Sequence, residues 1–280
     1  MKAILRIMHA GALRRPVGDC LEIFRRRFPG VRIDLSAAGS RECARRILTG
    51  EPFDVLLLAD PAVFSEFLVP DHVGDHFVFT TDQIVIGCSR YGHPYRSGRE
   101  IDGQNWMDVL AAEGVSTARS DEHLDPCGYR TLMVWQLAED FYHRPGLAAE
   151  LERHCRPIYA KSIDLVGPLL EGGLDYAFIC ASEARQFGLP YVVLPAMVNL
   201  GHPAHAGYYR RAAVTVTGRS LSDTTVVRGA PIKFAAGVSR RAEAPDLAEA
   251  FVDLLTGEEG QRVLEVKTAF CLLTFLLFRY

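Results

Sequence analysis

Three short loops in this sequence combine small residues with a position suited to begin a helix. They read HAGA at residues 9–12, AAGS at 37–40 and DPCG at 125–128. The first backbone N–H groups of a helix have no acceptor within it, and the helix dipole is positive at that end. Because glycine also lets the backbone approach a ligand closely, the three loops together predict an anion site, with each helix end contributing about 0.3–1 kcal/mol.

The loop at residues 125–128 also has a purely structural interpretation. Aspartate followed by proline is typical of a helix start, because the carboxylate accepts N–H bonds at the cap and proline presets the helical φ. Apolar residues then recur at helical spacing from Leu132 to Tyr142, and the segment 144–146 predicts the helix end. Tight turns from strand to helix need glycine in any case, so one such loop alone is weak support for a ligand site.

The elements that must hold the first two loops alternate between strands and helices. The predicted strands are 3–8, 31–35 and 53–58, and the predicted helices are 16–24, 41–48 and a third that begins at Asp60. We expect Ser40 and Asp60 to cap their helices. Strands that alternate with helices form a parallel sheet, whose ligand-facing loops lie at the carboxyl ends of the strands.

The chain then crosses into a second region and returns. The extended segment 77–88 predicts the crossing, and strands alternate with helices again from 115 to 179. The predicted elements of the last part are strands 191–195, 212–216 and 232–238 and helices 246–255 and 260–266. The sequence thus predicts an α/β protein of two lobes, 1–80 with 200–280 and 81–199, each a mixed, mainly parallel sheet flanked by helices. We expect a ligand cleft between the lobes and hinges near 80–82 and 195–199.

Composition narrows the function classes. The chain has 280 residues, 49% of them hydrophobic, and a formal charge of −3, which disfavours a nucleic-acid partner. Seven cysteines without a CxxC pair indicate neither a zinc ribbon nor a disulfide framework. No secretory signal is visible before the first predicted strand. The apolar segment 269–278 is too short for a bilayer span, and we expect it to form a buried helix or strand.

Several motifs, taken together, resemble the archaeal-type molybdate/tungstate-binding proteins of ABC importers. They are HAG at 9–11, AAGS at 37–40, NW at 105–106, RSD at 119–121 and LDPCGYRTLMVW at 124–135. The resemblance runs from Ile4 to about Leu264. It implies a two-lobed class II periplasmic-binding-protein fold and no enzymatic activity or cofactor. It also implies a monomer, periplasmic or extracellular and membrane-associated, that delivers an oxyanion to a permease and its ATPase.

The resemblance also implies which residues bind the ligand. Asp125 matches a carboxylate that bonds the metal of the oxyanion and helps to expand it from four to six oxygens. A second carboxylate of the family falls on Met197 here, and a serine of the family on Ala12. Tyr209 matches a cleft tyrosine, although Tyr208 is adjacent and the register stays open. The candidate ligand-binding residues are Gly11, Ala12, Gly39, Ser40, Asp125, Pro126, Cys127, Met197 and Tyr209.

These departures leave alternatives open for the ligand and for the protein. With fewer donors and one carboxylate fewer, tetrahedral coordination, weaker binding or another oxyanion such as sulfate are all compatible with the sequence. A cytoplasmic anion sensor or effector of the same fold is a second interpretation, consistent with the lack of a visible signal. A third is an enzyme that uses Cys127 beside His123, which requires a thiol of low pKa.

Five further side chains have a ligand interpretation and a structural one. His123, His202 and His205 are candidate metal ligands, but their spacing lacks the context of a structural zinc site. His9 could contact a ligand or be a loop histidine held by backbone bonds. Arg130, in the first turn of the predicted helix, opposes the helix dipole, so we expect it to pair with a carboxylate or to close the cleft.

Overall fold

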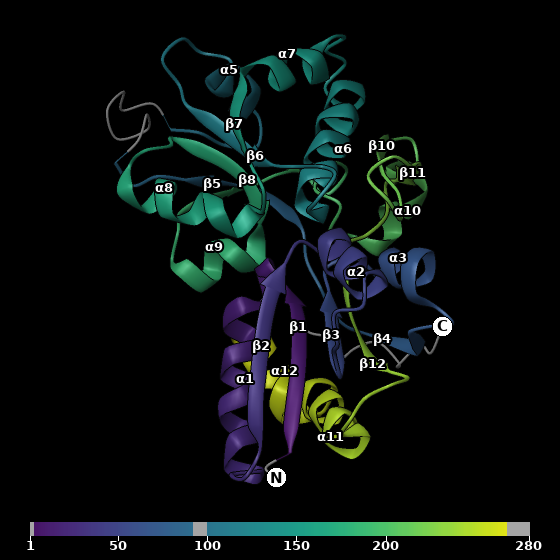
Figure 1. The fold of residues 1–280 in the computed structure, drawn as a ribbon. Helices are drawn as coiled ribbons and strands as arrows, with labels where there is room; N and C mark the ends of the chain where they lie inside the picture. The colour runs from purple at the N-terminus through teal and green to yellow at the C-terminus, as the bar shows by residue number, and fades with distance from the viewer. Residues whose placement is uncertain (1–2, 92–99, 268–280) are drawn as a thin grey trace. The chain divides into compact units, whose positions relative to one another are not determined.

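The computed structural model describes residues 3–91 and 100–267, which form two units (Figure 1). Unit 1 contains Met1–Thr81 and Lys233–Tyr280, and unit 2 contains Asp82–Ile232. The chain therefore enters unit 2 after Thr81 and returns to unit 1 after Ile232. Each unit is built on its own five-stranded sheet.

Unit 1 has a mixed sheet in the order β2-β1-β3-β12-β4. Its strands are β1 Ile4–Ala10, β2 Arg32–Ala38, β3 Val55–Leu58, β4 Val73–Thr81 and β12 Lys233–Ser239. Its helices are η1 Gly11–Leu13, α1 Arg14–Arg27, α2 Ser40–Leu48, α3 Pro61–Val63, η2 Phe64–Leu68, α11 Pro245–Thr256 and α12 Glu258–Lys267. β1 is parallel to β2 and β3, whereas β12 runs antiparallel to both β3 and β4.

The core of unit 1 lies around β3, all four residues of which are buried. Leu56 and Leu58 belong to a cluster that α2 and η2 cover. The helices α1, α11 and α12 pack on one another, with Phe24 and Phe251 in an edge-to-face contact at 5.5 Å between ring centroids. A strand buried on both faces needs a continuous apolar run, which explains why the sequence of β3 does not alternate.

Unit 2 has a mixed sheet in the order β7-β6-β8-β5-β9 and a separate hairpin of β10 and β11. Its strands are β5 Ile84–Cys88, β6 Thr117–Ser120, β7 Cys155–Tyr159, β8 Tyr176–Cys180, β9 Tyr191–Val193, β10 Ala213–Thr217 and β11 Thr224–Arg228. Its helices are α5 Trp106–Leu110, α6 Pro126–Phe141, α7 Leu147–His154, η3 Ser162–Leu165, α8 Val166–Glu171, α9 Ala181–Phe187, η4 Pro203–His205 and α10 Ala206–Tyr209. β6 is parallel to β7 and β8, and β5 is antiparallel to β8 and β9.

The expected α/β class with mixed sheets flanked by helices is confirmed. The division between the units differs from the expected one at the return of the chain, because residues 200–232 lie in unit 2. The side chain of Gln136 on α6 bonds the backbone N–H and C=O of Ala213, which ties β10 to unit 2. β11 was not expected.

The apolar segment 269–278, for which a buried helix or strand was expected, lies outside the described residues. No helix among residues 3–91 and 100–267 combines the length and the apolar character that crossing a membrane requires.

Candidate functional site

Two of the three small-residue loops lie at one edge of the unit 1 sheet. β1 and β2 are parallel neighbours, and their last residues, Ala10 and Ala38, are paired. The chain leaves both strands at this edge, into η1, which starts at Gly11, and α2, which starts at Ser40. Gly11 and Ala12 are buried. The structure therefore brings the two loops together, as the alternation of strands and helices predicts.

Ser40 does not cap α2 as expected, since the N-cap residue is Gly39. Ser40 is instead the first residue of the helix, and its buried Oγ accepts a hydrogen bond from the backbone N–H of Ala59 at 3.0 Å. This bond ties the start of α2 to the residue that follows β3. A hydroxyl that accepts one hydrogen bond still has its own hydrogen to donate, so Ser40 keeps the chemistry of an anion ligand.

His9, at the end of β1, is held by the backbone. Its Nδ1 lies 2.8 Å from the carbonyl oxygen of Ala10, to which it donates, and its ring is buried. Burial lowers the pKa of this imidazole, which favours the neutral form. The structure thus matches the interpretation of a loop histidine held by backbone bonds.

The third loop lies in unit 2 and is centred on Asp125. This residue is the N-cap of the 16-residue helix α6, as predicted, but its side chain makes no capping hydrogen bond. Its Oδ2 accepts instead from the backbone N–H of Ser162, at 2.8 Å. Burial raises the pKa of Asp125, and the hydrogen bonds from Ser162 oppose that rise. A buried carboxyl group therefore lies at the positive end of α6.

The first turn of α6 packs tightly against the loop before it. A Cβ atom on Gly128 would lie 2.5 Å from the backbone carbonyl carbon and oxygen of Asp121, so this position requires glycine. Pro126 and Cys127 are buried in the same turn. The guanidinium of Arg130 is also buried, 5.7 Å from the ring centroid of Tyr129. The sequence predicted this helix start because its signals are local.

Within unit 2, Tyr209 contacts the segment that carries Met197. The buried Tyr209 hydroxyl donates to the carbonyl oxygen of Ala196 and accepts from the N–H of His202 at 3.1 Å. Tyr208 instead donates to the carbonyl oxygen of Leu137, at 3.3 Å. The candidate ligand residue Tyr209 thus contacts the residue that precedes the candidate Met197.

Two buried acids in unit 2 were missed by the sequence analysis. Asp82 Oδ1 accepts from the N–H groups of Gln83, at 2.8 Å, and Ser182, at 3.3 Å, and burial raises the pKa of Asp82 to about 6. Glu183 accepts from Ser162 Oγ at 2.7 Å and from Cys180 N at 3.0 Å. Burial, followed by repulsion from Asp125, raises the pKa of Glu183 to about 8. Nothing in the local sequence separates these acids from exposed ones.

The remaining histidine candidates do not form a metal site with one another. His123 Nδ1 accepts from Thr217 N at 3.1 Å, and His202 Nδ1 accepts from Ala204 N at 3.2 Å, as an N-cap. The rings of His202 and His205 contact each other at 5.2 Å between centroids. Among the described residues, the group with metal-ligating geometry contains none of these histidines.

Cys127 is not the thiol of low pKa that the enzyme hypothesis requires. Its Sγ donates to the carbonyl oxygen of Phe178 at 3.6 Å. The hydrogen bond from Cys180 is the largest single effect and lowers the pKa of Cys127, but burial and the charges of Asp125 and Glu183 together outweigh it, so the net shift is upward. A buried thiol with a raised pKa is a poor nucleophile at neutral pH.

Two α/β units with mixed sheets flanked by helices are the architecture of the periplasmic binding proteins. The family model for bacterial extracellular solute-binding proteins matches residues 5–267, so this chain belongs to that family. In fold it is similar to the periplasmic molybdate-binding protein of Azotobacter vinelandii, with a TM-score of 0.67 at 16% identity over 94% of this chain and 97% of that one.

Several relatives have a higher sequence identity to this chain than that structure does. An uncharacterized solute-binding protein of Petrotoga mobilis is 33% identical over 92% of this chain and 81% of that protein. A putative ABC transporter molybdenum-binding protein of Haloferax volcanii is 36% identical over 82% of this chain and 71% of that protein. The molybdate/tungstate-binding protein WtpA of Pyrococcus abyssi is 29% identical over 93% of this chain and 82% of that protein.

Proposed function

We propose that this chain is the solute-binding component of an ABC importer and that it captures a tetrahedral oxyanion, molybdate or tungstate in the first place. Membership of the solute-binding family supports the general role. The names of the relatives from Pyrococcus abyssi and Haloferax volcanii support the ligand. The partners in this proposal are a membrane permease and its ATPase, and the place of action is the periplasm or the outer face of the membrane.

The observation that carries the proposal is the buried carboxyl group of Asp125 at the start of α6. A carboxylate beside a dianion is repulsive unless it bonds the metal or carries a proton. Burial raises the pKa of Asp125, which favours the protonated form. Asp125 can thus bind the anion in two ways, as a hydrogen-bond donor to its oxygens or as a direct ligand of its metal.

Unit 1 supplies the complementary groups in this proposal. The backbone N–H groups at the start of η1 and of α2 emerge from paired positions of neighbouring strands, and the Ser40 hydroxyl can donate a hydrogen bond. Backbone N–H groups suit an oxyanion without adding net charge. We propose that these unit 1 groups bind an oxyanion.

The side chains of Met197 and Ala12 make sulfate a second candidate ligand. Neither side chain can donate a hydrogen bond or ligate a metal through oxygen, so the site has fewer groups that distinguish molybdate from other dianions. Six-coordination needs more oxygen ligands than tetrahedral binding does. We therefore propose a tetrahedral mode and keep sulfate as the alternative ligand.

A thermal-shift screen tests the ligand, because a ligand that binds only the folded state raises stability by RT ln(1 + [L]/Kd). Purified protein is measured with molybdate, tungstate, sulfate, phosphate and chromate. We expect selective stabilisation by molybdate and tungstate, and its loss in Asp125→Ala. The matched control is Asp164→Ala, which removes an exposed aspartate in η3. A shift with sulfate alone would select the alternative, and no shift with any anion would reject the proposed site.

Cell fractionation tests the place of action. Recovery of the native full-length protein from the periplasmic or membrane-associated fraction supports the importer. Recovery from the cytoplasm, together with anion binding, would favour a sensor or effector of the same fold.

A further inference from the structure

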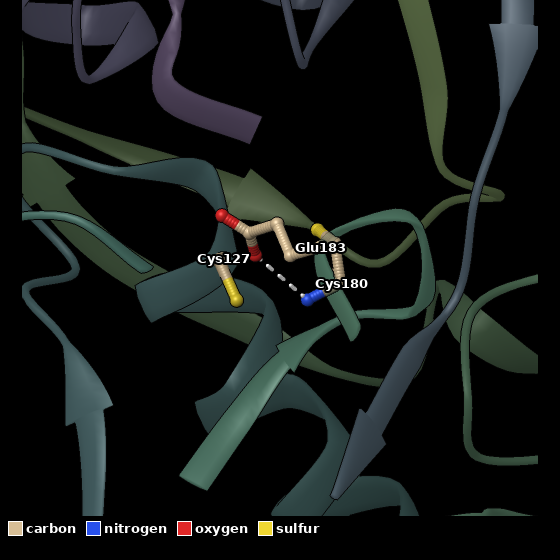
Figure 2. A group of neighbouring side chains, drawn as sticks. All are labelled: Cys127, Cys180 and Glu183. Carbon is tan, nitrogen blue, oxygen red and sulfur yellow. Dashed lines mark hydrogen bonds between the residues drawn. The ribbon is translucent and has the colours of Figure 1, made fainter. Parts of the chain in front are cut away.

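Two cysteines and a glutamate converge in the interior of unit 2. Cys127 lies in the first turn of α6, Cys180 is the N-cap of α9, and Glu183 lies in the first turn of α9. Their ligand atoms, two sulfurs and one carboxylate oxygen, all lie within 4.8 Å of one another, and all three residues are buried (Figure 2). In the view of Figure 2 the carboxylate is seen between the two sulfur atoms.

We propose that Cys127, Cys180 and Glu183 bind a thiophilic divalent cation of the zinc type. Two thiolates and a carboxylate are a ligand set that zinc accepts, with a fourth position left for water or another oxygen. In a tetrahedral zinc site with the usual bond lengths, neighbouring ligand atoms lie roughly 3.3–3.8 Å apart. The observed separations need to shrink by no more than about 1.5 Å to reach that geometry.

The carboxylate is already oriented by its neighbours. Glu183 Oε1 accepts a hydrogen bond from Ser162 Oγ at 2.7 Å, and Oε2 accepts one from the backbone N–H of Cys180 at 3.0 Å. Each carboxylate oxygen has a second lone pair, so these bonds leave room for a metal. Hydrogen bonds to ligating groups from outside the coordination sphere are typical of metal sites, because they fix ligand orientation.

The charges around the cluster favour a cation. Asp125 and Asp82 are both buried, and their negative charges disfavour the ionised form of Glu183. The positive charge of Arg130 acts in the opposite direction and lowers the pKa of Asp82 and of Cys127. A divalent cation bound by the three ligands would offset the negative charge gathered at the starts of α6 and α9.

The alternative to metal binding is a disulfide between the two thiols. The sulfurs of Cys127 and Cys180 are close enough to share a hydrogen bond. A disulfide oxidant such as oxidised glutathione would join them. The two cysteines lose two protons and two electrons, and the oxidant is reduced to two thiols. The convergence of Glu183 favours the cation, because a disulfide uses no carboxylate.

The test is a titration of the reduced, metal-free, full-length protein with Co²⁺, followed by competition with Zn²⁺. We expect thiolate-to-cobalt charge-transfer absorption that saturates at one equivalent, is displaced by Zn²⁺, and is accompanied by a rise in Tm. Cys127→Ser and Cys180→Ser should abolish the absorption, and the near-isosteric Glu183→Gln should weaken cobalt binding about tenfold or more. Cys155→Ser is the matched control, since Cys155 is a buried thiol of the same unit, on β7, and should leave the absorption unchanged.

The wild-type measurement alone can overturn the proposal, even if a variant fails to fold. Absence of the charge-transfer absorption in the reduced wild-type protein would reject the site. Persistence of the absorption in Cys127→Ser and Cys180→Ser would also reject the site. So would a disulfide between the two cysteines in a protein that, after reduction, binds no Co²⁺. The cation site does not depend on the proposed oxyanion, because the titration contains no oxyanion.

Discussion

The backbone N–H of Ser162 donates a 2.8 Å hydrogen bond to Oδ2 of Asp125, which joins the start of η3 to the start of α6. The same serine donates from Oγ to Glu183 at 2.7 Å. One residue thus orients two buried acids, the candidate anion ligand and the candidate cation ligand. A substitution at either acid can therefore be designed to preserve its contact with Ser162.

Asp125→Asn should separate binding from stability. An asparagine side-chain oxygen can still accept from Ser162 N, so we expect the free energy of unfolding to stay within about 1 kcal/mol of the wild type. The amide neither ligates the metal as a carboxylate does nor becomes a carboxylic acid, so stabilisation by molybdate should fall. Chemical denaturation and the thermal shift with molybdate measure the two effects, and an unchanged ligand shift would contradict the assigned role.

Met197→Glu should restore a carboxylate where the family resemblance places one. We expect binding of molybdate or tungstate to strengthen relative to sulfate, because sulfur in sulfate does not expand its coordination and would only be repelled. The ratio of Kd values from calorimetry measures this selectivity. Met197→Gln controls for size, and equal gains in both variants would argue against a metal ligand at this position.

Gly128→Ala should destabilise the protein by about 1–3 kcal/mol or more, because the added Cβ would overlap the Asp121 backbone. The matched control is Gly167→Ala in α8, where a Cβ meets no atom within 4 Å. There we expect no loss, or a gain of about 0.5–1 kcal/mol, since alanine is the better helix former. Equal unfolding free energies for the two variants would show that the first turn of α6 can move away from residue 121.

Tyr209→Phe should cost about 1–3 kcal/mol, because it removes a buried hydroxyl that bonds both Ala196 and His202. Tyr208→Phe removes a hydroxyl with one bond, to Leu137, on a less buried side chain, and should cost less. Denaturant midpoints of the two variants provide the comparison. A larger loss for Tyr208→Phe would contradict the expected difference between the two hydroxyls.

The buried carboxyl of Asp82 should make stability depend on pH. Burial raises the pKa of Asp82 from 3.8 to about 6. Well below pH 3.8 the carboxyl is protonated in both the folded and the unfolded state, and its contribution to stability is fully present. As the pH rises from 4 to 6 the unfolded state ionises first and stability is lost, by roughly 3 kcal/mol for a shift of this size. Asp82→Asn removes this dependence. Urea unfolding of both proteins between pH 4 and 7 measures the difference, and parallel profiles would contradict it.

The elements that could be predicted from the sequence are those fixed by neighbouring residues. Asp125 and Pro126 determine the start of α6 locally, and the apolar run of β3 reflects burial on both faces. Asp60 caps α3 as expected, accepting from the N–H of Ala62 at 2.9 Å. In each case the signal and its cause lie within a few residues.

The features that the sequence did not reveal depend on distant partners. Ser40 looks like a helix cap, but the N–H of Ala59, 19 positions away, determines its role. Glu183 is buried because α9 begins next to η3, where Ser162 bonds its carboxylate. A single sequence does not show which distant residues come into contact. The two buried acids and the cysteine pair could therefore not be identified from residue types alone.

The position of β12 in the unit 1 sheet has a consequence for biosynthesis. β12 lies between β3 and β4 and pairs with both, although it follows all of unit 2 in the chain. A ribosome therefore completes the contiguous segment Asp82–Ile232 before it makes the strand that joins β3 to β4. Until residue 239 has emerged, β3 lacks a partner at one edge and β4 has no partner strand in this sheet, whereas every strand of the second sheet already has its partners.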